Sequence, residues 1–309
     1  MDDIQMFSGG LGSWAAAKRH VSQCGRPPAL LFTDTLIEDD DLYRFLVEAG
    51  ADILGHPAER WSALLPELRS IPPLREMAQR KEHLGRLMRS AQTALPGLVW
   101  IRDGRTPWEV FHDERFVGNT MVARCSHILK QRLARSWLSE HAPAGQVRLL
   151  LGIGWQERHR FEGAPARGKV PATLGARQHW LPWVCLAPLC APPYLEGYEI
   201  RSQCERAGIA VPRLYDLGFA HNNCMGACVK AGHAQWRAVL KELPEAFAYA
   251  EQSEQALRAH LDRDVAVLRD RRGGKTRPLP LLEFRERMED GVPCDRNDRG
   301  GCGCFTDAE

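Results

Sequence analysis

The first stretch of this 309-residue chain that could do chemistry is SGGLGS at residues 8–13. Glycines allow the backbone to turn sharply and to bring its N–H groups against an anion without obstruction by a Cβ atom. The helix expected to follow adds N–H groups at its start and the positive end of its dipole. Ser8 and Ser13 add hydroxyl donors. The spacing matches neither a Walker loop nor a Rossmann fingerprint. We expect a phosphate cradle here, with a turn that only caps the helix as the alternative.

Cysteines are the second chemical signal, since the chain contains 10 of them. Cys224 and Cys228 flank a glycine-containing turn, and Cys302 and Cys304 lie in a glycine-rich tail. Two short-spaced thiol pairs can ligate zinc or an iron–sulfur cluster, and sulfur ligation alone does not distinguish the two. In the alternative, Cys302 and Cys304 carry sulfur or resolve a disulfide. The cysteines expected to be buried filler are Cys24, Cys185, Cys190 and Cys204.

These residues must be positioned by an alternation of short apolar runs and helical stretches. The predicted strands cover residues 4–7, 29–32, 98–101 and 147–153. The predicted helices cover residues 13–24, 38–49, 59–68, 76–94, 106–113, 126–141 and 232–267. This alternation is typical of a doubly wound α/β fold with a parallel sheet. Residues 162–180 are predicted to form a loop, and residues 269–309 an irregular tail.

The second predicted strand ends in a polar triplet, since residues 30–35 read LLFTDT. Ligands of open parallel sheets bind beyond the carboxyl ends of the strands. Thr33 and Asp34 are therefore candidate nucleotide contacts, because the carboxylate could accept from ribose hydroxyls or an adenine amino group. In the alternative, Asp34 is a helix N-cap or turn residue.

Five motifs, in order, resemble those of the phosphoadenosine phosphosulfate (PAPS) reductase-like family of the PP-loop superfamily. SGGLGS looks like the PP-loop pattern SGGxDS, and FTDT at residues 32–35 resembles the signature of the second strand. CSHILK at residues 125–130 is similar to the Cys-x-x-x-x-Lys element. GIGWQERHR at residues 152–160 is similar to Gly-x-Arg-x-x-Glu-x-x-Arg. Residues 214–228 resemble Leu-Tyr-x-x-Gly followed by Cys-x-x-Cys.

The resemblance implies an adenine nucleotide, ATP or PAPS, with Mg²⁺ as a further candidate ion. The implied nucleotide contacts are Ser8, Gly9, Gly10, Gly12, Ser13, Thr33, Asp34, Gly152, Arg158 and Arg160. The implied catalytic residues are Cys125, Lys130 and Glu157, with Cys125 as a metal ligand in an alternative role. Relatives commonly carry iron–sulfur clusters, which favours a 4Fe–4S cluster over zinc. The candidate ligands are Cys224, Cys228, Cys302 and Cys304.

Three departures from the family pattern limit what the resemblance implies. Gly12 stands where many ATP-cleaving members have Asp, and Gly154 replaces the usual Arg. The Glu-Cys-Gly-x-His tail, whose cysteine attacks sulfate in PAPS reductases, is absent from the sequence. The motifs therefore support the fold and a nucleotide site more strongly than they support reduction of a sulfonucleotide.

These observations predict an adenine-nucleotide-binding domain over residues 1–215, with a helical insertion at 57–95. Residues 216–309 are predicted to be a helical, cysteine-rich extension with a metal or iron–sulfur site. The expected function is sulfonucleotide reduction, or sulfur transfer to an acceptor such as a nucleic acid base, with a sulfur or electron donor protein as partner. The alternative is a non-catalytic nucleotide-binding accessory protein associated with nucleic acid.

Net charge and hydropathy exclude other classes of protein. The net charge is only +2, so any contact with nucleic acid must rest on local patches, of which the basic stretch at residues 269–277 is one. A window of 18 uninterrupted apolar residues is absent, so we expect no membrane span. The N-terminal sequence MDDIQMFSGG is not that of a signal or transit peptide. We expect a cytoplasmic protein.

Overall fold

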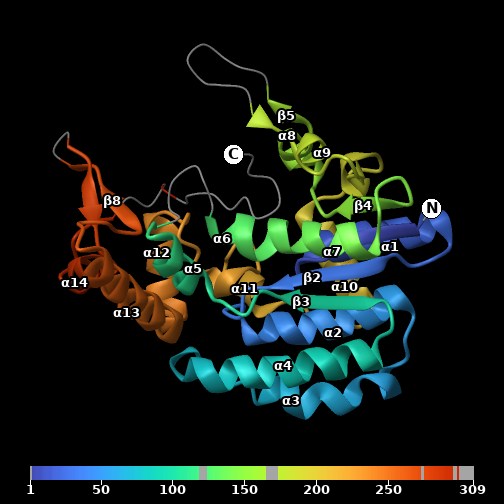
Figure 1. Ribbon diagram of the computed structural model, residues 1–309, viewed down its shortest axis with the longest axis horizontal. Coiled ribbons are helices and arrows are strands. Elements are labelled where there is room, and N and C mark those ends of the chain that lie inside the picture. The colour runs from blue at the N-terminus through green and yellow to red at the C-terminus, as the bar shows by residue number, and fades with distance from the viewer. Residues whose placement is uncertain (1, 118–123, 165–172, 273–274, 295–297, 299–309) are drawn as a thin grey trace.

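A parallel β-sheet forms the centre of the molecule (Figure 1). The computed structural model describes residues 2–117, 124–164, 173–272, 275–294 and 298. The sheet has five strands in the order β3-β2-β1-β4-β7, and every pair is parallel. Its strands are β1 (Asp2–Met6), β2 (Ala29–Asp34), β3 (Leu98–Arg102), β4 (Val147–Leu151) and β7 (Val184–Leu186). Helices flank it, so the predicted α/β class with a parallel sheet is confirmed.

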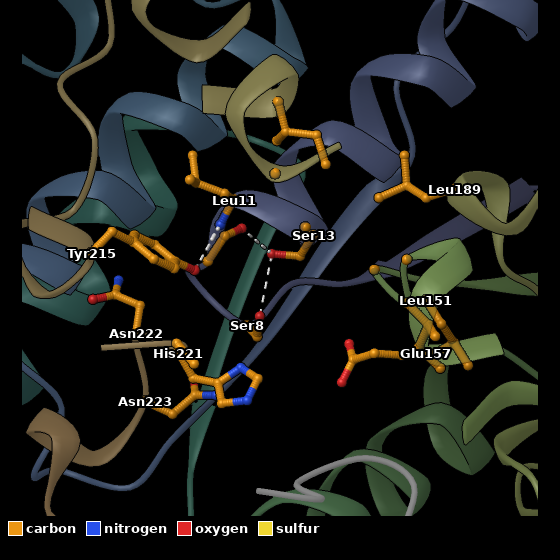
Figure 2. Close-up of a pocket in the computed structure, with 18 of the residues that line it drawn as sticks. Ser8, Leu11, Ser13, Leu151, Glu157, Leu189, Tyr215, His221, Asn222 and Asn223 are labelled. Carbon is orange, nitrogen blue, oxygen red and sulfur yellow. Dashed lines mark hydrogen bonds between the residues drawn. The ribbon is translucent and has the colours of Figure 1, made fainter. Parts of the chain in front are cut away.

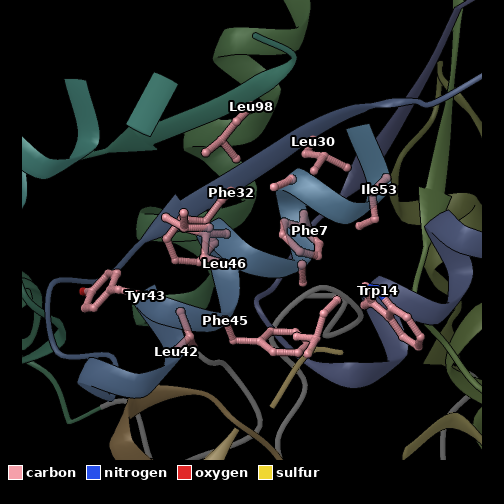
Figure 3. Packing of buried hydrophobic residues seen from close by; sticks show 14 of the residues in the cluster. Phe7, Trp14, Leu30, Phe32, Leu42, Tyr43, Phe45, Leu46, Ile53 and Leu98 are labelled. Atoms are coloured by element: carbon pink, nitrogen blue, oxygen red, sulfur yellow. The ribbon is translucent and has the colours of Figure 1, made fainter. Parts of the chain in front are cut away.

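Alternation along the strands supplies apolar side chains to both faces of the sheet. Leu30 and Phe32 of β2 point into one core cluster, and Leu31 points into the other. The first cluster, part of which is drawn in Figure 3, is covered by helices α1, α2, α4 and α10. The second is covered by α7 and α9. The bounds are α1 (Leu11–Cys24), α2 (Asp40–Leu54), α4 (Met77–Ala94), α7 (Leu133–His141), α9 (Ala176–His179) and α10 (Gly197–Arg206).

Residues 57–95 belong to the connection between β2 and β3. Helix α4 packs Leu84, Leu87 and Ala91 into the same cluster as the strands. The helix predicted at 59–68 is wrong in its extent, because α3 (Leu65–Arg69) is the only α-helix there and short 3₁₀ turns precede it. Pro66 lies in the first turn of α3, and it could not sit inside a longer helix without removing a hydrogen bond.

The direction of winding changes next to β1. The chain runs from β1 outward through β2 to β3, and then returns to place β4 on the opposite side of β1. Crossover connections therefore diverge between β1 and β4, which leaves a crevice beyond their carboxyl ends. The sequence of strands thus puts the loop after β1 and the loop after β4 opposite each other.

The C-terminal segment packs beyond the carboxyl edge of the sheet. Its elements are α12 (His233–Glu242), α13 (Pro244–Leu261), β8 (Leu268–Asp270), β9 (Arg277–Leu279) and α14 (Leu281–Glu289). A third core cluster joins Trp236, Phe247 and Phe284 of this segment to Trp108 and Phe111 of α5 (Pro107–Glu114). The described part of the segment contains three helices and a hairpin, and the cysteine-rich extension stays a prediction, because the tail cysteines Cys302 and Cys304 lie outside the described residues.

The irregular tail predicted from residue 269 is a wrong prediction in its first part. Strands β8 and β9 form an antiparallel hairpin, and α14 follows it. Glu254 of α13 holds both, since its buried carboxylate accepts from the amides of Val267 and Leu281, each at 2.6 Å. The strands are too short to show a periodicity, so the segment depends on such contacts with partners distant in the sequence.

The remaining elements are short. They are α6 (Arg124–Ser126), a π-helix η4 (His127–Arg132), α8 (Arg158–Glu162), β5 (Gly163–Ala164), β6 (Thr173–Leu174) and α11 (Arg213–Asp216). The 3₁₀ turns are η1 (Ala58–Arg60), η2 (Ser62–Leu64), η3 (Leu74–Glu76), η5 (Trp155–Glu157), η6 (Pro188–Cys190) and η7 (Cys224–Gly226). Within the described ranges, no helix combines the length and apolar character that crossing a bilayer requires.

Candidate functional site

A cavity of about 490 Å³ opens at the divergence between β1 and β4. One wall is the glycine-rich loop after β1, and the facing wall is the loop after β4. Residues of α10 and of the segment 215–223 complete it. Figure 2 shows Ser8 and Ser13 on the side of Tyr215 and His221, with Glu157 and Leu151 across the cavity. Open parallel sheets bind their ligands in this type of crevice.

The glycine-rich loop presents the start of helix α1 to the cavity. Gly9 has a φ of 72°, a left-handed conformation that favours glycine, and Gly10 is the N-cap residue. The first turn of α1 contains no acidic residue, and no side chain of the described residues caps it. The amides of Gly12 and Ser13 lie in this turn, where an α-helix leaves its N–H groups without helical partners. The positive end of the helix dipole adds to them, so the loop suits an anion.

Hydrogen bonds fix the shape of this loop. Ser13 Oγ donates to the carbonyl of Gly10 at 2.8 Å, and Ser8 Oγ lies 3.3 Å from Ser13 Oγ. The amide of Leu11 donates to the hydroxyl of Tyr215 at 3.3 Å, which ties the loop to a residue 204 positions later in the chain. Burial raises the pKa of Tyr215 to about 12, so its hydroxyl stays protonated at neutral pH. These contacts therefore fix the conformation of the loop.

Gly12 and Gly152 meet backbone to backbone. A Cβ atom on Gly12 would lie 2.7 Å from the carbonyl oxygen of Gly152. A Cβ atom on Gly152 would lie 2.6 Å from the backbone of Ser13. A Cβ atom does not approach another non-bonded heavy atom this closely in real proteins, so a side chain at either position must push the two loops apart. The glycine at position 12, where an Asp occurs in the resembling family, thus has a steric reason in this chain.

The segment after α11 forms the polar wall of the cavity. Asn222 is buried and donates through Nδ2 to the carbonyl of Gly9 at 2.8 Å. His221 and Asn223 flank it and also line the cavity. Burial lowers the pKa of His221, with Glu157 acting in the opposite direction and Arg160 adding to the decrease. His221 is therefore a neutral imidazole at neutral pH, able to accept a proton.

Two predicted residues of the β4 side, Glu157 and Arg160, lie on the cavity wall and pair with each other. Arg158 does not line it. Its guanidinium donates to the carbonyl of Cys190 at 3.0 Å and lies 3.4 Å from Glu162. The short helix α8 points alternate side chains in different directions, so the structure separates two arginines that the sequence placed together.

Thr33 and Asp34 lie at the end of β2 and do not line the cavity. Both are buried, and the Asp34 carboxylate accepts from the amide of Leu36, the Tyr43 hydroxyl and the Trp100 indole at 2.7, 2.8 and 3.1 Å. Burial raises the pKa of Asp34, while these donors oppose the increase. The structure gives Asp34 an internal role, and its contact with a nucleotide stays a prediction.

Lys130 also lies at the β2 end, on the π-helix η4. Its buried ammonium is 3.3 Å from Oε1 of Glu38, a residue that is fully buried. The second oxygen of Glu38 accepts from the amide of Cys224. Glu38 thus joins the predicted residues Lys130 and Cys224, although sequence reasoning did not select it. Its only signal was its position at the start of the acidic run EDDD.

Arg80 is a second residue that sequence reasoning missed. Its guanidinium is buried and donates to the carbonyls of Leu36, Glu38 and Pro72 at 3.0, 2.7 and 2.8 Å. Leu36 has a φ of 69°, which is unfavourable for a residue with a side chain. Arg80 stabilises the loop that carries this strained residue and Glu38. Nothing in its helical surroundings distinguished it from an exposed arginine.

The described cysteines gather in the C-terminal core without forming a ready ligand set. Cys224 is buried in the third core cluster, and Cys125, Cys228 and Cys294 pack against it partly buried. Cys224, Met225 and Gly226 have φ values of 52, 48 and 71°, a strained turn. Among the described residues, no three Cys, His, Asp or Glu side chains are grouped as metal ligands. Cys185, Cys190 and Cys204 are buried as predicted, whereas Cys24 is exposed.

Comparison with known protein families, with curated proteins and with solved structures gave no significant match.

Proposed function

We propose that this protein binds an adenine nucleotide, ATP or PAPS, in the cavity between β1 and β4 and uses it in sulfur chemistry. The observation that carries the proposal is the uncapped start of α1, which faces this cavity at the divergence of the sheet. The amides of Gly12 and Ser13 and the helix dipole would hold phosphate oxygens, and the side chains of Ser8 and Arg160 add polar and charged contacts. The resemblance to PAPS reductase-like proteins is the reason for proposing adenine as the base of this nucleotide.

The side chains of the cavity favour sulfur transfer over reduction of a sulfonucleotide. None of its described lining residues is a cysteine, so a thiol that attacks sulfate must come from elsewhere. In the transfer reaction, a carbonyl oxygen of an amide-like base attacks the α-phosphorus of ATP, and pyrophosphate leaves. The base loses its N–H proton to Glu157 or His221. Hydrosulfide released by a donor protein then adds to the carbon of that carbonyl and displaces AMP, which carries away the former carbonyl oxygen. The S–H proton returns to the base nitrogen and leaves a thiocarbonyl.

A resident metal or cluster would draw on the cysteines of the C-terminal core. Cys224, Cys228 and Cys125 contact one cluster of apolar residues there, but the described part of the chain lacks an assembled ligand set. We therefore derive no step through a 4Fe–4S cluster or a zinc ion. Ligation by Cys302 and Cys304 stays a prediction from the sequence, because both lie outside the described residues.

Substituting Gly152 tests the nucleotide site. Gly152→Ala places a methyl group 2.6 Å from the backbone of Ser13, so it must displace the start of α1. We expect the affinity for ATP and PAPS, measured by calorimetry, to fall at least about 100-fold. This factor corresponds to about 2.7 kcal/mol, which is less than the loss of two hydrogen bonds to a charged phosphate would cost. Gly50→Ala in α2 is the matched control, because a Cβ atom there meets only ordinary contacts at 3.6 and 3.8 Å.

A second variant separates loss of binding from loss of folding. Ser8→Ala removes one hydroxyl of the cavity wall that makes no hydrogen bond to the described part of the backbone, and we expect about tenfold weaker binding with an unchanged thermal transition. If both Gly152→Ala and Ser8→Ala bind ATP and PAPS as the wild type does, the cavity is not the nucleotide site.

The second candidate function is nucleotide binding without catalysis, as an accessory protein associated with nucleic acid. The Gly12–Gly152 contact favours it, because it leaves no space for the Asp that occurs in many ATP-cleaving relatives of the resembling family. Release of AMP from ATP in the presence of bulk RNA and DNA distinguishes the two. Turnover supports the enzyme, and tight binding without turnover supports the accessory protein.

A further inference from the structure

The β8–β9 hairpin concentrates positive charge. Residues 268–277 contain five basic side chains and one acidic side chain, a net charge of four. The whole chain carries only +2, so the rest of it is net negative by two. A nearly neutral protein thus presents one strongly basic element, at the end of the C-terminal segment (Figure 1).

Part of this charge is used to build the hairpin. The buried carboxylate of Asp270 accepts from Arg272 at 3.0 and 3.1 Å and from Arg287 at 2.9 Å, and Arg277 lies 3.2 Å away. Hydrogen bonds from Arg272 contribute most to holding the pKa of Asp270 well below its ordinary value. One acid therefore orders three arginines, and the group keeps a net positive charge.

Other cations on the same surface are left available. Arg263, Arg269 and Lys275 are exposed, and within the described ranges none of them has a carboxylate within 4.0 Å. Arg115, at the end of α5, contacts the imidazole of His260 rather than an acid. We call the group Arg115, Arg263, Arg269, Arg271, Arg272, Lys275 and Arg277 the hairpin surface.

This surface is hollowed on both sides of the hairpin. One depression, of about 310 Å³, is lined by Arg115, Arg263 and Arg269, and the one acid among its described lining residues, Asp264, pairs with Arg258. A second, of about 210 Å³, is lined by Arg269, Arg271, Arg272 and Arg287, with Asp270, the acid that orders this group, also in its wall. Arginines that converge on concave surfaces suit oxyanions such as phosphate, because their planar donors bind two oxygens at once.

We propose that the hairpin surface binds the phosphate backbone of duplex nucleic acid. Binding of single strands relies on aromatic rings on which unpaired bases stack. Among the Phe, Tyr and Trp residues described there, only Phe116 is exposed, at 36%. Charge without a stacking platform fits a duplex, whose bases are already stacked. The proposal goes beyond the nucleotide site, because none of the residues of the hairpin surface belongs to the described lining of that cavity.

The test measures binding of the full chain to a fluorescent DNA duplex of about 30 base pairs by anisotropy over a range of salt concentrations. The triple variant Arg263→Gln/Arg269→Gln/Lys275→Gln removes the three available cations. Each phosphate contact contributes about 0.9 to the slope of log affinity against log salt, so we expect the slope to fall by about 2 to 3. The affinity at low salt should fall at least about 100-fold.

A matched control removes the same charge elsewhere. Arg60→Gln/Arg69→Gln/Arg89→Gln changes three exposed arginines on η1, α3 and α4, and it should keep the wild-type slope. The variant Arg263→Lys/Arg269→Lys should keep the wild-type salt slope, because it keeps the charge, and should lose only part of the affinity, because it loses the planar donors. All variants should bind ATP with unchanged affinity, which separates this proposal from the nucleotide site.

Three results would overturn the proposal. The first is a wild-type protein that does not bind the duplex. The second is an equal loss of affinity in the control and hairpin variants, which would show that only the net charge of the protein matters. The third is binding to single strands or to an acidic peptide such as polyglutamate in clear preference to the duplex.

Discussion

The carboxyl end of β2 and the carboxyl ends of β1 and β4 belong to the same edge of one sheet, yet they are built in opposite ways. At the β2 end, Asp34 and Glu38 are fully buried, and each carboxylate accepts several hydrogen bonds from protein groups. At the β1–β4 end, the helix start lacks an acid and faces a cavity of about 490 Å³.

This difference shows that a polar residue after a strand has two possible uses. Where neighbouring elements supply donors, as Tyr43 and Trp100 do for Asp34, the carboxylate becomes part of the interior. Where two backbones approach without side chains, as Gly12 and Gly152 do, donors remain for a ligand. The β2 end should therefore govern stability, and the β1–β4 end should govern binding.

Removing Glu38 should produce the largest effect on stability. Glu38→Gln takes away the carboxylate 3.3 Å from the buried ammonium of Lys130, and we expect the free energy of unfolding to fall by about 3 to 5 kcal/mol. Glu38→Gln/Lys130→Met removes both charges and should recover much of this loss. Urea unfolding measures both. A loss below about 1 kcal/mol, or weaker ATP binding by the folded variant, would contradict the division between the two ends.

Two arginines of α8 sharpen the comparison within the binding region. Arg160→Gln removes a cation from the cavity wall, and we expect about tenfold weaker binding of ATP because a charged hydrogen bond is lost. Arg158→Gln is the control, since its guanidinium contacts Cys190 and Glu162 instead. Titration calorimetry should separate the variants, while their thermal transitions stay alike. Equal affinities of the two variants for ATP would show that Arg160 does not contact the nucleotide.

The smallest expected effect is a change in the pH dependence of stability. Burial lowers the pKa of His221 in the folded protein below the value of 6.5 that applies when it is unfolded. The unfolded chain therefore binds the proton more readily, so this contribution to stability is complete above pH 6.5 and is lost as the pH falls toward the folded pKa. His221→Gln should flatten the decline in unfolding free energy between about pH 7 and pH 5. A steeper decline of the unfolding free energy in the variant would show that the pKa of His221 is raised by folding, which contradicts the prediction.

The sheet was the most predictable part of the molecule, because buried parallel strands read as short apolar runs. The predicted strands at 4–7, 29–32, 98–101 and 147–153 all correspond to strands of the sheet. Strand β7 was missed, since it has only three residues and Val184 is exposed. Hairpin β8–β9 was missed for a related reason. The carboxylates of Asp270 and Glu254 stabilise it, and its strands show no apolar pattern that the sequence would reveal.

The site was predictable only in part. The glycine-rich loop and the pair Glu157 and Arg160 do line the cavity, as does Gly152. Glu38 and Arg80 could not be recognised, because their partners Lys130 and Leu36 are 92 and 44 residues away in the chain. A buried ion pair depends on which elements meet in space, and one sequence does not record that.

The sequence by itself determined the order of strands and helices and the loop that exposes the start of α1, because both depend on local periodicity and on glycine. Tertiary structure alone decided which polar side chains face the cavity and which are buried at the β2 end. Hydrogen bonds between distant elements, such as that of Asn222 to Gly9 across 213 residues, made that choice. Local residue types set what a segment can form, and packing decides what it contacts.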